Sequence, residues 1–242
     1  MKTPFSVLLA CGICLPVAAW LPKNLAGQNP GVSIAPHPPA SSFAPGGGGI
    51  PITSLPFVID QCGTYFLASC LTGPAGSDGI VIDADFVTLD LNGLTLFGSP
   101  GSLNGIQVGF NSTLRSCSSS LNDQHGFFIS AGCLIVDCNS FSNGLGGIRA
   151  LDGNSIRRCL AYANSGAGLY LENRNNAVEG NQAIGNSNAN FFLADSNNLL
   201  RQNCSFGASI SYSIAPGNHN AAILNQPGAA FLSDQPWANF ED

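Results

Sequence analysis

Charged side chains are scarce in this chain, since Asp, Glu, Lys and Arg make up only 9% of its 242 residues, against roughly 25% in an average domain. Met occurs once, and no Lys follows Lys23. This composition disfavours helices, whereas the 29 Gly and the many Asn and Ser favour short strands joined by turns. The formal net charge of −6 and the lack of Lys clusters also exclude nucleic acid and anionic membranes as expected partners.

The N-terminus predicts export. Lys2 precedes a largely apolar run from Phe5 to Ala19, so we expect residues 1–19 to be a signal peptide and the protein to be secreted or held at the cell surface. The stretch from Leu8 to Cys11 loosely resembles a lipoprotein processing box, but the apolar run continues beyond it. A linker rich in Pro, Gly and Ser is expected over residues 20–50. No later run is long and apolar enough to cross a bilayer.

Residue sets typical of metal centres are also lacking. The three His are scattered, and no Cys-x-x-Cys remains after the signal peptide. We therefore expect no cofactor, with Ca²⁺ as the one ion left open. Seven Cys follow residue 19, so at least one has no partner within the chain. A bond between Cys62 and Cys70 requires a turn, because a fully extended segment would hold them about 26 Å apart.

A phrase of one small, one apolar, one variable and one apolar residue recurs along the chain. It reads Gly-Ile-Val-Ile at Gly79 and returns at spacings of 26, 21, 21, 21, 22 and 21 residues. The later copies begin at Gly105, Gly126, Gly147, Gly168, Asn190 and Ser211. A fixed period of this length indicates a solenoid, and the leucine-rich pattern is absent. Short β-like runs in each unit predict an all-β, single-stranded parallel β-helix of about seven coils of 21–26 residues.

Equal offsets in the units predict the columns of side chains that fill this solenoid. The first column is Ile80, Ile106, Phe127, Ile148, Leu169, Phe191 and Tyr212. The second is Ile82, Val108, Ile129, Ala150, Leu171, Leu193 and Ile214, and the third is Leu114, Ile135, Ile156, Val178 and Leu200. Period-two alternation places these columns inside. The repeats then occupy residues 79–215, between an N-terminal cap strand at 51–78 and a C-terminal cap or tail at 216–242.

The sequence resembles a known group at this point. The stretch Asp-Phe-Val-Thr-Leu-Asp-Leu-Asn-Gly from Asp85, the Gly-Ile-x-Val coils and the closing Pro-Trp-Ala-Asn-Phe are similar to right-handed parallel β-helix repeat proteins of the pectate-lyase-like superfamily, in particular secreted bacterial members without assigned activity. The resemblance covers roughly residues 50–242 and implies a right-handed solenoid. It leaves function open, because that superfamily holds lyases, hydrolases, epimerases and non-catalytic proteins.

The cysteines allow two interpretations. Two arginines directly precede Cys159, and neighbouring cations favour a reactive thiolate. The 21-residue period instead places Cys159 in one structural column, which we expect to be a buried, inert ladder. The members of that column are Cys117, Cys138, Cys159, Asn181 and Asn203.

Charged residues recur at a similar period. Arg115, Asp137, Arg158, Glu179 and Arg201 follow at spacings of 22, 21, 21 and 22 with alternating sign. We expect an exposed ladder of ion pairs of modest energy. The alternative is the site of a polysaccharide lyase or glycoside hydrolase, in which Asp137, Arg158 and Glu179, or else Asp152 and Asp195, carry the chemistry. The Asn-Thr-Asp, Gly-His-Gly and Arg-Ile-Lys motifs of β-helix hydrolases are missing, and the Gln-His-Gly at His125 is a weak match.

The outward position of the repeated phrase supplies the best binding candidate. Four consecutive coils present Phe128, Arg149, Tyr170 and Phe192, a line suited to stacking on sugar rings or docking a protein. The alternative is that a long loop or the C-terminal tail, for instance through Trp237 and Phe240, covers this line.

Asp152, Asn173 and Asp195 recur beside that line, as Ca²⁺ ligands or as turn formers.

Taken together, these features lead us to expect a secreted, non-catalytic protein that binds an extracellular polysaccharide or a cell-surface partner, with a polysaccharide-active enzyme as the alternative.

Overall fold

The computed structural model describes residues 49–225 and 235–241. Every regular element in this part of the chain is a short strand, numbered β1 to β26. No helix that would be long and apolar enough to cross a membrane is found among these residues. The expected signal peptide and all but the last two residues of the expected linker lie outside the described residues.

The strands form three parallel sheets, which we call A, B and C. Sheet A contains β1 (Ile50–Ile52), β3 (Gly63–Leu67), β6 (Val87–Asp90), β9 (Thr113–Arg115), β12 (Leu134–Val136), β15 (Ser155–Arg157), β18 (Ala177–Glu179), β21 (Leu199–Arg201) and β24 (His219–Asn220). Sheet B contains β2 (Phe57–Ile59), β5 (Ile80–Ile82), β8 (Ile106–Phe110), β11 (Phe127–Ala131), β14 (Ile148–Asp152), β17 (Leu169–Leu171), β20 (Ala189–Leu193) and β23 (Ile210–Ile214). Sheet C contains β4 (Leu71–Thr72), β7 (Thr95–Phe97), β10 (Ser118–Ser120), β13 (Asn139–Phe141), β16 (Leu160–Tyr162), β19 (Gln182–Ile184), β22 (Cys204–Phe206), β26 (Asn239–Glu241) and β25 (Ile223–Asn225).

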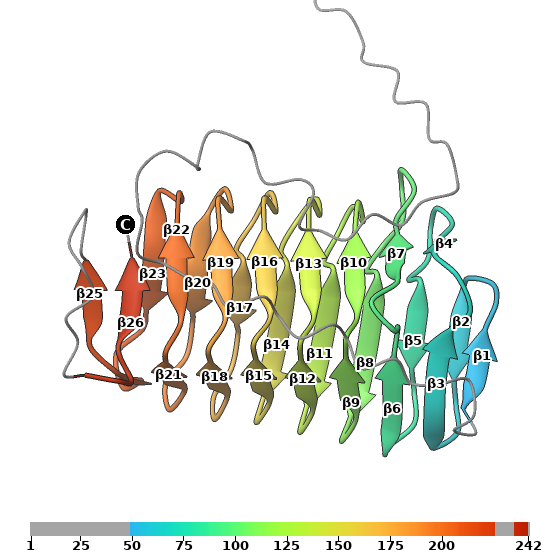
Figure 1. The fold of residues 1–242 in the computed structure, drawn as a ribbon, viewed down its shortest axis with the longest axis horizontal. Coiled ribbons are helices and arrows are strands. Elements are labelled where there is room, and N and C mark those ends of the chain that lie inside the picture. Colours follow the sequence, from blue (N-terminus) through green and yellow to red (C-terminus); the bar gives the residue numbers. More distant parts are fainter. Residues whose placement is uncertain (1–48, 226–234, 242) are drawn as a thin grey trace, which may run out of the picture. The chain divides into compact units, whose positions relative to one another are not determined.

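Each coil contributes one strand to sheet B, then one to sheet A, then one to sheet C, so the strands stack side by side along the solenoid (Figure 1). The predicted parallel β-helix of about seven coils is thereby confirmed. The three sheets extend to the N-terminal side of the first predicted repeat, because β2, β3 and β4 pair in register with β5, β6 and β7. At the other end, β26 lies between β22 and β25.

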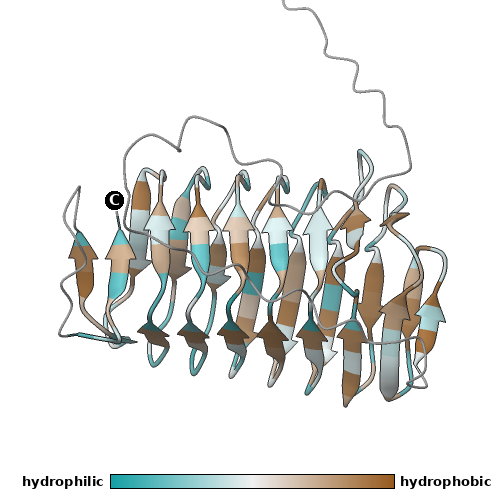
Figure 2. Cartoon of the chain, in the orientation of Figure 1, coloured by the Kyte–Doolittle hydropathy of each residue, from teal (hydrophilic) through white to brown (hydrophobic). Residues whose placement is uncertain are grey.

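The three predicted columns form the core. Phe127 pairs in register with Ile106 and Ile148, and all three side chains are fully buried. The third column follows the same rule in sheet A, where Ile135 pairs with Leu114 and Ile156. Figure 2 shows the result as hydrophobic bands that recur on successive strands. Every coil thus buries its apolar residues against equivalent residues of its neighbours, which is how solenoids gain stability.

Tight turns separate the sheets, and the backbone conformation and close packing there determine which residues stand at several positions. Directly after β9, β12, β15, β18 and β21 of sheet A one residue adopts positive φ, as in Asp137 (55°), Arg158 (51°) and Gly180 (66°). The recurrent Gly before β5, β8, β11, β14 and β17 of sheet B has a different cause. A Cβ at Gly147 would lie 2.6 Å from the carbonyl oxygen of Gly168, so the coils approach too closely there for any side chain.

Asparagines form three ladders at the corners of the coils, and all of them except Asn218 are buried. Their side-chain oxygens accept a backbone N–H from the preceding member of each ladder, as Asn143 does from Asn122 at 3.1 Å. The corner ladders are Asn154, Asn176, Asn198 and Asn218; Asn181, Asn203 and Asn239; and Asn122, Asn143, Asn164, Asn186 and Asn190. These bonds satisfy turn amides that the sheets leave without a partner.

Candidate functional site

Four outward-facing side chains cross sheet B, and we call them the aromatic strip: Phe128, Arg149, Tyr170 and Phe192. They lie in β11, β14, β17 and β20, and each is in register with the next. Each is half-buried, whereas the residues on either side within its strand are buried in the core. The alternation of a β-strand therefore fixes which residues form the strip.

The side chains of the aromatic strip contact one another along the stack. The Arg149 Cζ lies 5.1 Å from the ring centre of Phe128 and 5.8 Å from that of Tyr170. The Tyr170 and Phe192 rings lie 5.2 Å apart at an interplanar angle of 57°. A guanidinium between two ring faces gains about 0.5–1 kcal/mol per contact at exposed sites. The strip is therefore a continuous row across four coils.

Glu172 completes this surface and was missed in the sequence. Arg149 Nε donates to Glu172 Oε2 at 2.7 Å, and Arg149 Nη2 lies 2.5 Å from the same oxygen. Both side chains are about one-third exposed. The signal was available, because Glu172 follows Tyr170 by two residues and so faces the same side of its coil. The one cation of the strip is thus paired with a carboxylate from the next coil.

His125 lies two residues before β11, the strand of sheet B that carries Phe128. Its Nδ1 accepts the Gly146 N–H at 3.1 Å, and its side chain is buried. Burial, reinforced by the charge of Arg149, lowers the pKa of His125 to about 4. His125 is therefore neutral at pH 7 and adds no charge to the neighbouring strip.

The column that contains Cys159 is buried as expected. Cys117, Cys138 and Cys159 lie inside the solenoid, followed by Asn181 and Asn203. Burial raises the pKa of the Cys159 thiol well above its ordinary value, which opposes formation of a thiolate. The Asn181 Oδ1 accepts the Cys159 N–H at 2.8 Å and so continues the column. The Cys159 thiol therefore lies in a packed core position.

Cys62 has an exposed, free thiol. The disulfide between Cys62 and Cys70 that the sequence left open therefore does not form.

The expected ladder of charges forms in part: Asp137 pairs with Arg158 and Glu179 pairs with Arg201, but the five residues do not share one register. Arg115 pairs with Val136 in the sheet, so Asp137 lies one residue further, at the turn. There Asp137 accepts two bonds from Arg158, from Nε at 2.8 Å and from Nη2 at 3.0 Å. The physical reason is that Asp137 and Arg158 themselves occupy the left-handed turn position directly after β12 and β15, and so lie outside the strands.

A second set of charges lies within the strands of sheet A. Arg157 pairs in register with Glu179, whose Oε2 lies 3.9 Å from its Nε. The Glu179 Oε1 lies 3.1 Å from the Nη2 of Arg201. The three residues proposed for catalysis thus divide into an Asp137–Arg158 pair at the turn and a Glu179 shared by two other arginines.

The residues considered for Ca²⁺ also have partners on neighbouring coils. Asn173 Nδ2 donates to Asp152 at 2.7 Å, and Arg174 Nη2 lies 3.0 Å from Asp195. The Ser196 N–H and Arg174 lower the pKa of Asp195. This donor set does not fit Ca²⁺, which takes about six to eight oxygen ligands. Within residues 49–225 and 235–241, no group of three or more His, Cys, Asp or Glu is arranged to hold a metal ion.

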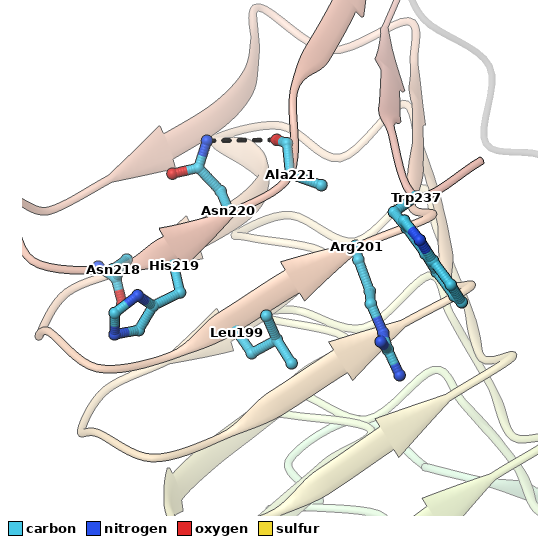
Figure 3. Close-up of a pocket in the computed structure, with 7 residues that line it drawn as sticks. All are labelled: Leu199, Arg201, Asn218, His219, Asn220, Ala221 and Trp237. Carbon is cyan, nitrogen blue, oxygen red and sulfur yellow. Dashed lines mark hydrogen bonds between the residues drawn. The ribbon is translucent and has the colours of Figure 1, made fainter. Parts of the chain in front are cut away.

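A pocket of about 500 Å³ lies at the C-terminal end of sheet A. Figure 3 shows it, with Leu199, Arg201, Asn218, His219, Asn220, Ala221 and Trp237 as its lining. The Cζ of Arg201 lies 4.9 Å from the Trp237 ring. Trp237 is therefore placed beside sheet A, and Phe240 lies in β26 of sheet C. The alternative that Trp237 and Phe240 cover the aromatic strip is therefore wrong for these two residues.

Comparison with known proteins gives the family. The family model described as "right handed beta helix region" matches residues 78–226. A search of curated proteins finds no match. Among solved structures, the catalytic domain of a GH87 α-1,3-glucanase variant in complex with tetrasaccharides is 16% identical, with 80% of this chain and 44% of that chain covered and a TM-score of 0.54.

Two further structures are more distant. The pectate lyase Pel9A is 13% identical, with 72% of this chain and 63% of that chain covered and a TM-score of 0.43. The A-module of the mannuronan C-5 epimerase AlgE4 of Azotobacter vinelandii is 9% identical, with 72% and 88% covered and a TM-score of 0.34. The chain thus spans less than two thirds of the glucanase domain and of the pectate lyase. The likeness to the glucanase domain concerns the fold alone, and the match over residues 78–226 shows that the chain belongs to the right-handed β-helix family.

Proposed function

We propose that the protein is a non-catalytic binder of an extracellular polysaccharide, which lies along the aromatic strip. One observation carries this proposal: four consecutive coils present half-exposed Phe128, Arg149, Tyr170 and Phe192 in direct register. Aromatic side chains offer large, rigid apolar surfaces on which the C–H faces of sugar rings stack. A linear ligand that repeats along its length suits a surface that repeats along the solenoid.

The fold itself is compatible with this ligand class. The α-1,3-glucanase catalytic domain that shares the fold has been solved with tetrasaccharides. Export to a place where polysaccharides occur rests on the signal peptide expected at residues 1–19, which lies outside the described residues.

The carboxylates support binding over catalysis. Enzymes of most glycoside hydrolase families use two carboxyl groups, about 5–9.5 Å apart, that flank the scissile bond. Asp137 and Glu179 lie two coils apart with Arg157 and Arg158 in the coil between them, and both carboxylates are bonded to arginines. Neither Asp137 nor Glu179 is thereby left to face a substrate as an acid or base.

The test is a screen of soluble neutral and uronic-acid polysaccharides, with and without Ca²⁺, that measures both binding and cleavage. We expect at least one polysaccharide to bind and none to yield new reducing ends or unsaturated products. The double variant Tyr170→Ala, Phe192→Ala should lose binding. Cleavage of any polysaccharide would overturn the non-catalytic assignment, and unchanged binding by the double variant would remove the strip as the site.

A further inference from the structure

We infer that the polysaccharide bound along the aromatic strip is a neutral one, recognised through its hydroxyl groups and C–H faces, and not a polyuronate. This inference rests on the proposed function and adds the charge class of the ligand. It follows from the state of the one cation in the strip, Arg149, and from the charges that surround it.

Arg149 already holds a carboxylate. Its Nε donates to Glu172 Oε2 at 2.7 Å, and its Nη2 contacts the same oxygen. A uronate carboxylate would have to displace a competitor that is attached to the next coil and so is always present at high effective concentration. Glu172 would then lie unpaired beside the incoming anion, and like charges in contact are unfavourable.

Elsewhere the described residues offer no free cation to a polyanion. Each of the six arginines in residues 49–225 and 235–241 has a carboxylate oxygen within 3.9 Å, and no Lys occurs there. His125, the titratable group next to the strip, is neutral above pH 5 because its pKa lies at about 4. The whole chain carries a formal net charge of −6, which repels a polyanion at long range.

The same groups suit a neutral sugar. The Arg149–Glu172 pair presents N–H donors and carboxylate acceptors side by side, and a guanidinium with five N–H groups retains donors beyond those used by Glu172. Neighbouring sugar hydroxyls both donate and accept, so they match such a pair. The rings of Phe128, Tyr170 and Phe192 supply the stacking surface on either side.

The test compares wild type with Glu172→Gln, which removes the competing carboxylate and keeps the shape of the side chain. Asp137→Asn is the matched control, since it frees Arg158 at the sheet A turn and changes the net charge equally. The probes are soluble neutral glucans, polygalacturonate and alginate, and binding is measured by affinity electrophoresis at low salt. Circular dichroism melting checks that both variants fold.

We expect wild type to bind a neutral glucan and to bind neither polyuronate. Glu172→Gln should gain affinity for the polyuronates over Asp137→Asn by about threefold to fivefold, the effect of one exposed charge pair. Polyuronate binding by wild type as tight as that of the glucan would overturn the inference and leave the proposed function standing. Equal polyuronate affinity in the two variants would also overturn it. Failure to bind any of the polysaccharides would overturn the proposed function itself.

Discussion

Arg158 and Cys159 are neighbours in the chain, yet their side chains lie on opposite sides of the solenoid wall. The Arg158 guanidinium is exposed and bonded to Asp137, whereas the Cys159 thiol is buried in the core. The pair of cations before Cys159 therefore does not produce a reactive thiolate. Position within the coil, and not sequence proximity, decides the chemistry of the sulfur.

This separation predicts slow alkylation of Cys159. Burial raises the pKa of its thiol, so iodoacetamide at pH 8 should modify it only on the timescale of unfolding. Cys62, which is exposed and free, is the internal control and should react within minutes. Peptide mass spectrometry of the time course measures both sites. Rapid modification of Cys159 in the folded protein would contradict its placement in the core.

The alternation within β11 predicts unequal costs for two adjacent phenylalanines. Phe127 is fully buried, so Phe127→Ala should lower the free energy of unfolding by about 3–5 kcal/mol. Phe128 faces outward and loses mainly its contact with Arg149, so Phe128→Ala should cost about 1 kcal/mol or less. Urea titration followed by circular dichroism gives both values. Similar costs would mean that the assignment of Phe127 to the core and of Phe128 to the surface is wrong.

The corner asparagines predict a cost for losing one side-chain amide. Asn181→Ala leaves the Cys159 N–H and the Ile156 carbonyl without their bonds to Asn181, at 2.8 and 2.9 Å. Unsatisfied buried groups should lower the free energy of unfolding by about 1–3 kcal/mol. The exposed neighbour Gln182 is the control, and Gln182→Ala should change the value by less than about 0.5 kcal/mol. Equal effects in the same urea titration would argue against a stabilising ladder.

His125 predicts a pH dependence of stability. Its pKa is lowered from 6.5 in the unfolded chain to about 4 in the folded protein, so between these values the unfolded state binds more protons. Its contribution is therefore fully present above pH 6.5 and is lost as the pH falls to 4, with a slope of at most about 1.4 kcal/mol per pH unit. His125→Asn should flatten the curve of unfolding free energy against pH in this window. The exposed His219 is the control, and an equal effect of His219→Asn would contradict the assignment.

Spacing alone predicted the columns of the core. Alternate residues of a strand face inward, so aligning the repeats fixes which residue of each strand is buried. Asp137 escaped this reasoning, since it stands 22 residues after Arg115 while Leu114 and Ile135 stand 21 apart. That one-residue difference separates a turn from a strand. The corner asparagines Asn122 and Asn143 also share the 21-residue period and were detectable in the sequence.

Other features depend on three-dimensional reach. The Arg149–Glu172 pair requires knowing how two long side chains bend toward each other across adjacent coils. Trp237, which shortly precedes β26, lies beside sheet A because β26 inserts into sheet C between β22 and β25. The order of these strands in the sheet therefore differs from their order in the chain. No local pattern in the sequence indicates such an insertion.

The central claim is that a polysaccharide binds along the aromatic strip, and the affinity of Tyr170→Ala tests it most directly. Isothermal titration with the polysaccharide selected by the screen should show about a threefold to tenfold loss relative to wild type, the effect of one aromatic stacking contact. Tyr162→Ala, which removes an exposed tyrosine from sheet C, should bind as wild type does. Unchanged affinity in Tyr170→Ala, or an equal loss in Tyr162→Ala, would contradict the account.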